Sequence, residues 1–107
     1  MPRRVVIADD AREDLLSIYG YVAAHHSPER ADRLLDRLQA ACLSLAEQPL
    51  RGNMPIEMQL LGVQDYREIH IGTYRILYRV NEDQVVVYGV ADGRRDMQGF
   101  LQRRLTR

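Results

Sequence analysis

The spacing of apolar residues changes from helical to strand-like midway along the chain. Between Ala11 and Leu45 they recur every three or four positions, as on one face of a helix, whereas from Tyr66 onward they alternate with polar residues. Two helical stripes and a set of alternating strands can be buried together only by packing helices on a sheet. The pattern therefore favours an α+β fold.

The first half is predicted to form a helical hairpin. Asp10 and Glu13 have the spacing of a capping box, so the first helix should begin there and end at the two adjacent histidines. Ser27 as N-cap and Pro28 in the first turn should open the second helix, which Pro49 should end. The polar face of the second helix carries Arg30, Arg33, Asp36 and Arg37.

Most strands are predicted in the second half. Residues 66–71 and 74–80 should form a β-hairpin around the turn Gly72-Thr73. Residues 85–91 are apolar on both faces, as expected for a central strand. A β-branched run over residues 4–8 should supply one further strand before the helices.

Two weaker elements complete the prediction. The loop over residues 49–62 is rich in proline and glycine and should contain a short strand near residues 58–61, and residues 97–105 should form a final helix. The order is β-α-α-β-β-β-α. We expect one domain over residues 1–107, with an antiparallel-rich sheet of about four strands, the hairpin on one face, and an arginine-bearing face left relatively open.

All 15 basic residues are arginine. No lysine is available for a Schiff base or as a general base. The net charge is zero, which gives no long-range attraction to nucleic acid or anionic membranes, but residues 94–107 hold five arginines against Asp96 alone, a local charge of +4. This basic segment either binds an anionic partner or is a solvated helix end, and both interpretations stay open.

Cofactor and metal sites are not expected. Gly89, Gly93 and Gly99 do not have the spacing of a phosphate-binding loop. The adjacent His25 and His26 point in different directions on a helix, and His70 is far away in sequence, so no metal site is predicted. The single cysteine, Cys42, cannot form an internal disulfide, and no apolar run is long enough to span a bilayer. These features predict a cytoplasmic protein with a buried structural thiol.

Five short motifs in a fixed order closely resemble one family. They are Ser27-Pro28 opening a leucine-rich helix, Pro49-x-x-Gly52, Tyr66-Arg67-Glu68-Ile69, Gly72-x-Tyr74-Arg75-Ile76-x-Tyr78 and Val90-x-x-Gly93-Arg94-Arg95-Asp96. Together they resemble the ParE toxins of bacterial type II toxin–antitoxin modules, within the RelE/ParE superfamily. The resemblance covers almost the whole chain.

The superfamily contains members with two different activities, which differ in their catalytic residues. RelE-like members are ribosome-dependent mRNA endonucleases that combine arginines with lysines, or with a C-terminal histidine or tyrosine, because RNA cleavage needs a general base and a general acid. Arg75 and either Arg94 or Arg95 correspond to the phosphate-binding arginines. Lysine is absent, and Phe100 and Leu101 stand in the C-terminal region. No catalytic residue is therefore predicted.

The resemblance to the ParE branch implies an inhibitor of DNA gyrase rather than an enzyme. Such a toxin would trap the complex of gyrase with cleaved DNA and inhibit bacterial growth, without sequence-specific DNA binding of its own and without a membrane partner. Candidates for contact with the target are the arginines Arg75, Arg79, Arg94, Arg95, Arg103 and Arg104.

The resemblance also implies a ParD-like antitoxin whose disordered segment folds onto the toxin. The helical hairpin and the adjoining sheet should form the apolar groove that accepts it. Its candidate residues are Tyr19, Val22, Ala23, Leu34 and Leu38, for which ordinary core packing is an equally open interpretation.

Two other functions stay open. One is a RelE-like ribosome-dependent endoribonuclease with a substituted catalytic set, and the other is a toxin-derived interaction module that has lost its toxicity.

Overall fold

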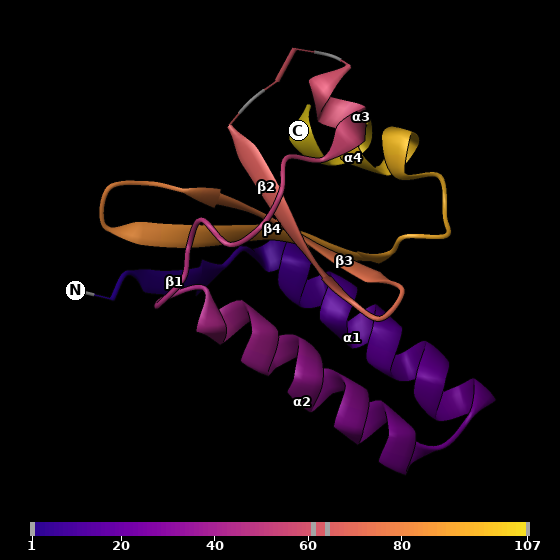
Figure 1. The fold of residues 1–107 in the computed structure, drawn as a ribbon. Coiled ribbons are helices and arrows are strands. Elements are labelled where there is room, and N and C mark those ends of the chain that lie inside the picture. The colour runs from indigo at the N-terminus through magenta and orange to yellow at the C-terminus, as the bar shows by residue number, and fades with distance from the viewer. Residues whose placement is uncertain (1, 61, 64, 107) are drawn as a thin grey trace.

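The computed structural model describes residues 2–60, 62–63 and 65–106. Eight elements follow one another along the chain (Figure 1): β1 (Arg4–Ile7), α1 (Asp9–His25), α2 (Pro28–Ser44), α3 (Ile56–Gln59), β2 (Tyr66–Ile71), β3 (Tyr74–Val80), β4 (Gln84–Asp92) and α4 (Met97–Leu105). The strands form one sheet in the order β1-β4-β3-β2, in which β1 runs parallel to β4 and the other neighbours are antiparallel. The predicted α+β architecture is confirmed.

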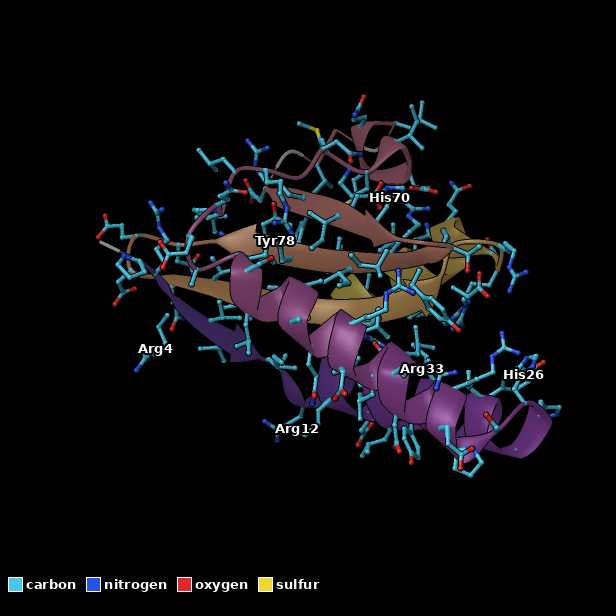
Figure 2. The ribbon with its side chains drawn as sticks, turned by 60° about the horizontal axis from the view of Figure 1, so that its bottom comes forward. Arg4, Arg12, His26, Arg33, His70 and Tyr78 are labelled. Atoms are coloured by element: carbon cyan, nitrogen blue, oxygen red, sulfur yellow. The ribbon has the colours of Figure 1, made fainter. Side chains whose placement is uncertain are left out.

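The helical hairpin covers one face of the sheet, with α1 and α2 side by side (Figure 1). Ser27 caps α2, because its hydroxyl accepts a hydrogen bond from the backbone N–H of Arg30 at 3.1 Å, and Pro28 is the first helical residue. Tyr78 is fully buried between the sheet and the hairpin (Figure 2). The other residues of this core are Ala11, Leu15, Leu38, Ala41, Cys42, Leu45, Ile69, Ile76, Val85, Val87 and Val90.

The predicted start of α1 and the predicted end of α2 are wrong. Helix α1 begins after Ala8 without a side-chain cap, and Asp10 is the second helical residue rather than the cap. Its carboxylate lies 3.8 Å from Arg104, so a long-range ion pair replaces the local capping bond. Helix α2 ends at Ser44 instead of continuing toward Pro49, because the next residues form tighter turns that bury Leu45.

The strand predicted near residues 58–61 is also wrong. Residues 56–59 form the short helix α3, and Leu61 lies outside the described residues. Met58 is almost fully buried against the second face of the sheet. In this helical turn Met58 packs inward while Glu57 pairs with Arg75 on β3. The predicted alternating strand did not include this arrangement.

The second face of the sheet is not open. Helices α3 and α4 lie on the side opposite the hairpin (Figure 1). Their apolar side chains form a second buried cluster with the sheet, made of Met58, Leu77, Ala91, Met97, Phe100 and Leu101. Strand β4 is apolar on both faces, so burying it requires cover from both sides.

A β-bulge in β4 makes this two-sided packing possible. Leu77 pairs with Gly89 and Tyr78 pairs with Val87, so Tyr88 is an extra residue without a direct partner on β3. The insertion reverses the alternation of β4 beyond this point, and Val87 and Val90 both face the hairpin. Tyr88 packs edge-on against Tyr66 on the other face.

Two glycines of the sequence motifs have structural roles. Gly72 has a φ of +58° in the β2–β3 turn, which favours glycine. A Cβ on Gly52 would lie 2.3 Å from the carbonyl oxygen of Glu68, so only glycine lets this loop approach β2. None of the described helices has the length and apolarity needed to cross a membrane.

Candidate functional site

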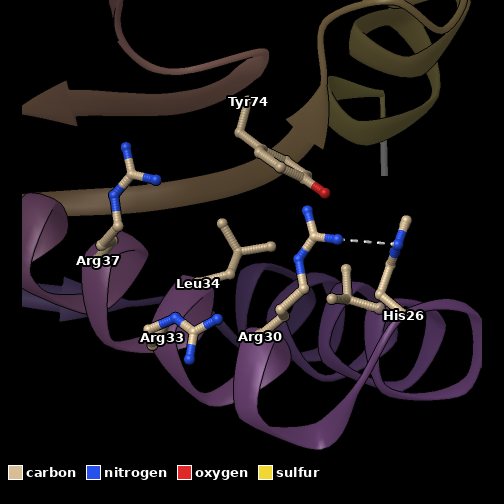
Figure 3. A pocket seen from close by; sticks show the side chains of 7 residues that line it. His26, Arg30, Arg33, Leu34, Arg37 and Tyr74 are labelled. Atoms are coloured by element: carbon tan, nitrogen blue, oxygen red, sulfur yellow. Dashed lines mark hydrogen bonds between the residues drawn. The ribbon is translucent and has the colours of Figure 1, made fainter.

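A basic groove lies between α2 and the turn end of β3 (Figure 3). It has a volume of about 350 Å³ and is lined by Val22, His26, Arg30, Arg33, Leu34, Arg37 and Tyr74. We call it the hairpin groove. Arg30 and Arg37 reach from α2 toward the sheet on either side of Leu34, and Tyr74 faces them from β3 (Figure 3). The groove therefore has an apolar floor and a basic rim.

The rim arises from the helical repeat of α2. Arg30, Arg33 and Arg37 are separated by three and four residues, so they lie in one row on the helix, next to Leu34. All three are exposed, and among the described residues none of them forms an ion pair with a carboxylate. The guanidinium of Arg30 lies 3.3 Å from the ring nitrogen Nδ1 of His26. The row keeps its positive charge available for a partner.

The position of the row opposes the helix dipole. Arg30 is in the first turn of α2 and Arg33 follows in the second. Positive side chains near a helix N-terminus are unfavourable, because the unpaired N–H groups there already carry partial positive charge. Arg30 in the first turn therefore does not stabilise α2 through the helix dipole.

A second depression adjoins the hairpin groove and shares Val22, His26 and Tyr74 with it. Its volume is about 440 Å³, and its far side is formed by Asp92, Arg94 and Arg95 at the end of β4. Arg94 pairs with Asp92 at 2.6 Å, and this hydrogen bond holds the pKa of Asp92 below its usual value. The remaining lining residues are Asp14, Ser17, Ile18, Tyr21, Val90 and Ala91.

Of the five apolar candidates predicted from the sequence, Val22 and Leu34 line the hairpin groove. Leu38 is fully buried in the core under α2. Tyr19 joins the two helices by donating its hydroxyl to Asp32 at 2.8 Å, which raises the pKa of Tyr19. Ala23 is half-buried and lines neither depression.

The guanidinium of Arg75 is enclosed by two carboxylates. Its Nε donates to Glu68 on the neighbouring strand β2 at 2.6 Å, and its two terminal nitrogens donate to both oxygens of Glu57 on α3, at 2.7 and 2.9 Å. Only 11% of the Arg75 side chain is exposed. The bidentate pairing raises the pKa of Arg75 and lowers that of Glu57.

Glu68 has further partners in the same network. Asn53 donates to its second carboxylate oxygen at 3.2 Å, and the His70 ring lies 3.1 Å from that oxygen. The network fastens α3 and the Asn53 loop to the sheet.

Arg104 is held in a similar way on α4. It donates two hydrogen bonds to Asp14 on α1, at 2.7 and 2.9 Å, and one to the backbone oxygen of Tyr88 at 2.8 Å. Its guanidinium also lies 4.6 Å from the centre of the Phe100 ring. With 12% of the side chain exposed, Arg104 clamps α4 to α1 and β4.

The other four predicted arginines are more accessible. Arg79 lies 3.9 Å from Asp65 and above the Tyr66 ring. Arg95 and Arg103 are exposed and line a small depression beside Phe100. Arg94 is exposed and paired with Asp92. Arg94 and Arg95 thus precede α4, and Arg103 lies in its last turn.

Sequence reasoning missed the groove-lining residues His26, Arg30, Arg33, Arg37 and Tyr74. The three arginines were assigned to the polar face of the second helix, and their spacing was the available signal. The sequence gives no information on where Tyr74 lies relative to α2. In the structure Tyr74 lies opposite this face of α2, so the two form the walls of a groove. Among the described residues, no three His, Cys, Asp or Glu side chains gather as a metal site.

The chain matches a family of toxins from bacterial toxin–antitoxin systems. The model of the family described as ParE toxin of type II toxin–antitoxin system, parDE, matches residues 5–97. The chain belongs to this family. No curated protein matches the chain significantly by sequence.

Three solved structures share the fold. A chain of the chromosomal ParDE system from P. aeruginosa superimposes with a TM-score of 0.72 at 17% identity, over 84% of this chain and 95% of that one. A chain of the RelBE2 toxin–antitoxin complex from Mycobacterium tuberculosis gives 0.63 at 25% identity, over 86% and 99%. A double arginine-to-alanine mutant of E. coli RelE in the free state gives 0.62 at 14% identity, over 96% and 98%.

Proposed function

We propose that this ParE-type toxin inhibits DNA gyrase in the bacterial cytoplasm as a non-catalytic poison, and that a ParD-like antitoxin neutralises it. The observation that carries the non-catalytic part is the state of Arg75. Its guanidinium is bound by Glu57 and Glu68 within the chain. Phosphate would have to displace two carboxylates from a largely buried site, at the cost of leaving their charges unpaired.

Tyr78 on the same strand is not suited to proton transfer. Tyr78 is fully buried, and its hydroxyl accepts a hydrogen bond from the backbone N–H of Gly52 at 3.0 Å. Burial raises the pKa of Tyr78, which makes it a poorer base at neutral pH. The absence of lysine from the sequence supports the same conclusion.

The proposed target-binding surface is the exposed basic region formed by the segment before α4 and the last turn of that helix. Arg94, Arg95 and Arg103 are accessible there, whereas Arg75 and Arg104 are engaged in internal ion pairs. Binding of a macromolecular target by this region would rest on charge and shape complementarity and would require no chemistry of the toxin.

The proposed antitoxin site is the hairpin groove. It combines apolar contacts from Val22 and Leu34 with a charged rim, as suits a segment that folds on binding. The similarity to structures from ParDE and RelBE systems supports a partner of this kind.

The proposal is tested with gyrase, relaxed plasmid, ATP and the purified toxin. We expect inhibited supercoiling and accumulation of linear DNA held by gyrase. The triple variant Arg94→Gln/Arg95→Gln/Arg103→Gln should lose most of this effect, whereas the charge-matched control Arg4→Gln/Arg12→Gln/Arg51→Gln should keep it. No effect of the folded wild-type toxin at micromolar concentration would contradict the gyrase target.

A RelE-like endoribonuclease is the second candidate, because the chain shares 25% identity with a RelBE2 structure. It predicts cleavage of ribosome-bound mRNA that the purified toxin performs without gyrase. Primer extension on translated mRNA would detect such cleavage. The gyrase proposal expects intact mRNA in this assay.

A further inference from the structure

We propose that the row Arg30–Arg33–Arg37 in the hairpin groove selects an amphipathic helix that carries acidic residues at helical spacing, so that charge determines which antitoxin segment the toxin accepts. This inference rests on the proposed antitoxin function and names the chemistry of the partner. It concerns the arginines on the rim, which sequence reasoning did not include among the binding residues.

The charges of the row are available to a partner. The three guanidinium groups are exposed, and among the described part of the chain no carboxylate pairs with them. Asp32 of α2 lies toward α1, where it accepts from Tyr19, and among the described residues neither Glu29 nor Asp36 forms an ion pair with the row. Elsewhere on the surface, Arg12 pairs with Asp9 and Arg94 pairs with Asp92. The row is thus a set of exposed arginines without ion pairs beside a groove.

The spacing of the row fits a helix. At a rise of 1.5 Å per residue, Arg30, Arg33 and Arg37 are distributed over about 10 Å along α2. A partner helix packed along α2 with Asp or Glu at positions i, i+3 or i+4, and i+7 presents carboxylates at the same intervals. Each guanidinium can then meet one carboxylate, in a bidentate geometry where the approach allows it.

The floor of the groove favours a peptide over nucleic acid. Val22, Leu34 and the Tyr74 ring lie beside the row and can bury apolar side chains. A sugar-phosphate backbone would meet the arginines but would leave this apolar surface uncovered. An amphipathic helix satisfies both parts, because its acidic residues meet the rim and the adjacent apolar residues enter the groove.

The test is a selection of peptides on the complete toxin made by cell-free synthesis. A display library of 25-residue peptides is selected on the wild type, and binders are measured against the triple variant Arg30→Gln/Arg33→Gln/Arg37→Gln. The control is Arg4→Gln/Arg12→Gln/Arg51→Gln, which removes the same charge at exposed positions. In Figure 2, Arg4 and Arg12 lie away from Arg33. Circular dichroism verifies that both variants are folded.

We expect selected peptides to carry acids at i, i+3 or i+4, and i+7 beside apolar residues. They should bind the row variant ~10- to 100-fold more weakly, as expected for the loss of three exposed ion pairs, and the control variant with less than ~3-fold change. Raising the salt concentration should weaken wild-type binding much more than binding to the row variant.

Three results would overturn the inference. They are binders without acidic enrichment, equal binding to wild type and row variant, or failure to recover any binder. A fluorescent 24-base-pair DNA duplex is measured in parallel, and tight duplex binding that depends on the row, without acidic peptides, would assign the groove to nucleic acid instead. None of these measurements involves gyrase, so the gyrase proposal can fail while this inference stands.

Discussion

The toxin uses arginine in two opposite ways on its two sides. On the side of α3 and α4, Arg75 and Arg104 are largely buried and bound by carboxylates from distant elements. On the hairpin side, the row Arg30–Arg33–Arg37 is exposed and has no carboxylate partner among the described residues. The same side chain therefore fastens elements together in one region and stays available in the other.

The difference shows why a count of arginines is a poor guide to function. A buried guanidinium that is fully paired has little capacity left for a ligand, and its removal leaves buried acids unpaired. An exposed, unpaired guanidinium contributes little to the free energy of unfolding and can form an ion pair with a partner. Pairing within the chain, rather than residue type, separates structural arginines from binding candidates.

The most damaging change should be Arg75→Ala. It leaves the buried Glu68 and the partly buried Glu57 without their cation, and we expect a loss of ~3–5 kcal/mol in the free energy of unfolding. Urea denaturation followed by circular dichroism measures it. A loss below ~1 kcal/mol would mean that Arg75 is not a structural residue and would remove the contrast between the two sides.

Arg104→Ala should have a somewhat smaller effect, ~2–3 kcal/mol. Asp14 loses both bonds to the guanidinium but still accepts a hydrogen bond from the backbone N–H of Val90 at 2.9 Å. Because the clamp joins α4 to the body of the protein, hydrogen exchange in α4 should accelerate first. Uniform acceleration over all elements would argue against a local clamp.

Acid should weaken the Arg75 network through Glu57. Pairing with Arg75 lowers the pKa of Glu57 in the folded state, so the ionised carboxylate adds stability above its unfolded pKa of ~4.3, and this contribution is lost as pH falls through the folded value. The stability advantage of wild type over Glu57→Gln should therefore be complete at pH 7 and shrink toward pH 3. Parallel urea titrations across this range test it, and a constant difference would contradict the pairing.

The smallest effect is expected for Arg33→Gln. Arg33 has no ion pair among the described residues, and Arg30 and Arg37 as well as Glu29 and Asp36 lie three or four positions from it on α2, so stability should change by less than ~0.5 kcal/mol. Thermal unfolding at low salt is the appropriate measurement. A loss above ~1 kcal/mol would show that the row serves the fold.

The sequence predicted much of the fold because many determinants were local. Ser27 and Pro28 were sufficient to place the start of α2, and Gly72 the turn between β2 and β3. The final helix has the predicted bounds of residues 97–105, and its N-cap is Asp96, which accepts from the N–H of Gly99. Errors occurred where distant contacts override local signals, as at Asp10 and in α3.

The candidate site was less predictable. The motifs that carry the family resemblance mainly hold the fold together: Arg67 donates to the carbonyl of Gly52 at 2.8 Å, and Glu68 binds Arg75. The residues of the hairpin groove lie mostly outside these motifs, on the charged face of α2. The sequence contains no signal that Tyr74 lies opposite this face of α2.

The sequence by itself determined the helical hairpin, the turns, the family and the absence of lysine, since these depend on neighbouring residues or on composition. Tertiary structure alone decided which arginines are neutralised and which stay available. Arg75 meets Glu57, and Arg104 meets Asp14, across 18 and 90 residues of sequence. Ion pairs between residues this far apart in the sequence follow from how the elements pack, because the electrostatic energy depends on the distance between two charges in space and not along the chain.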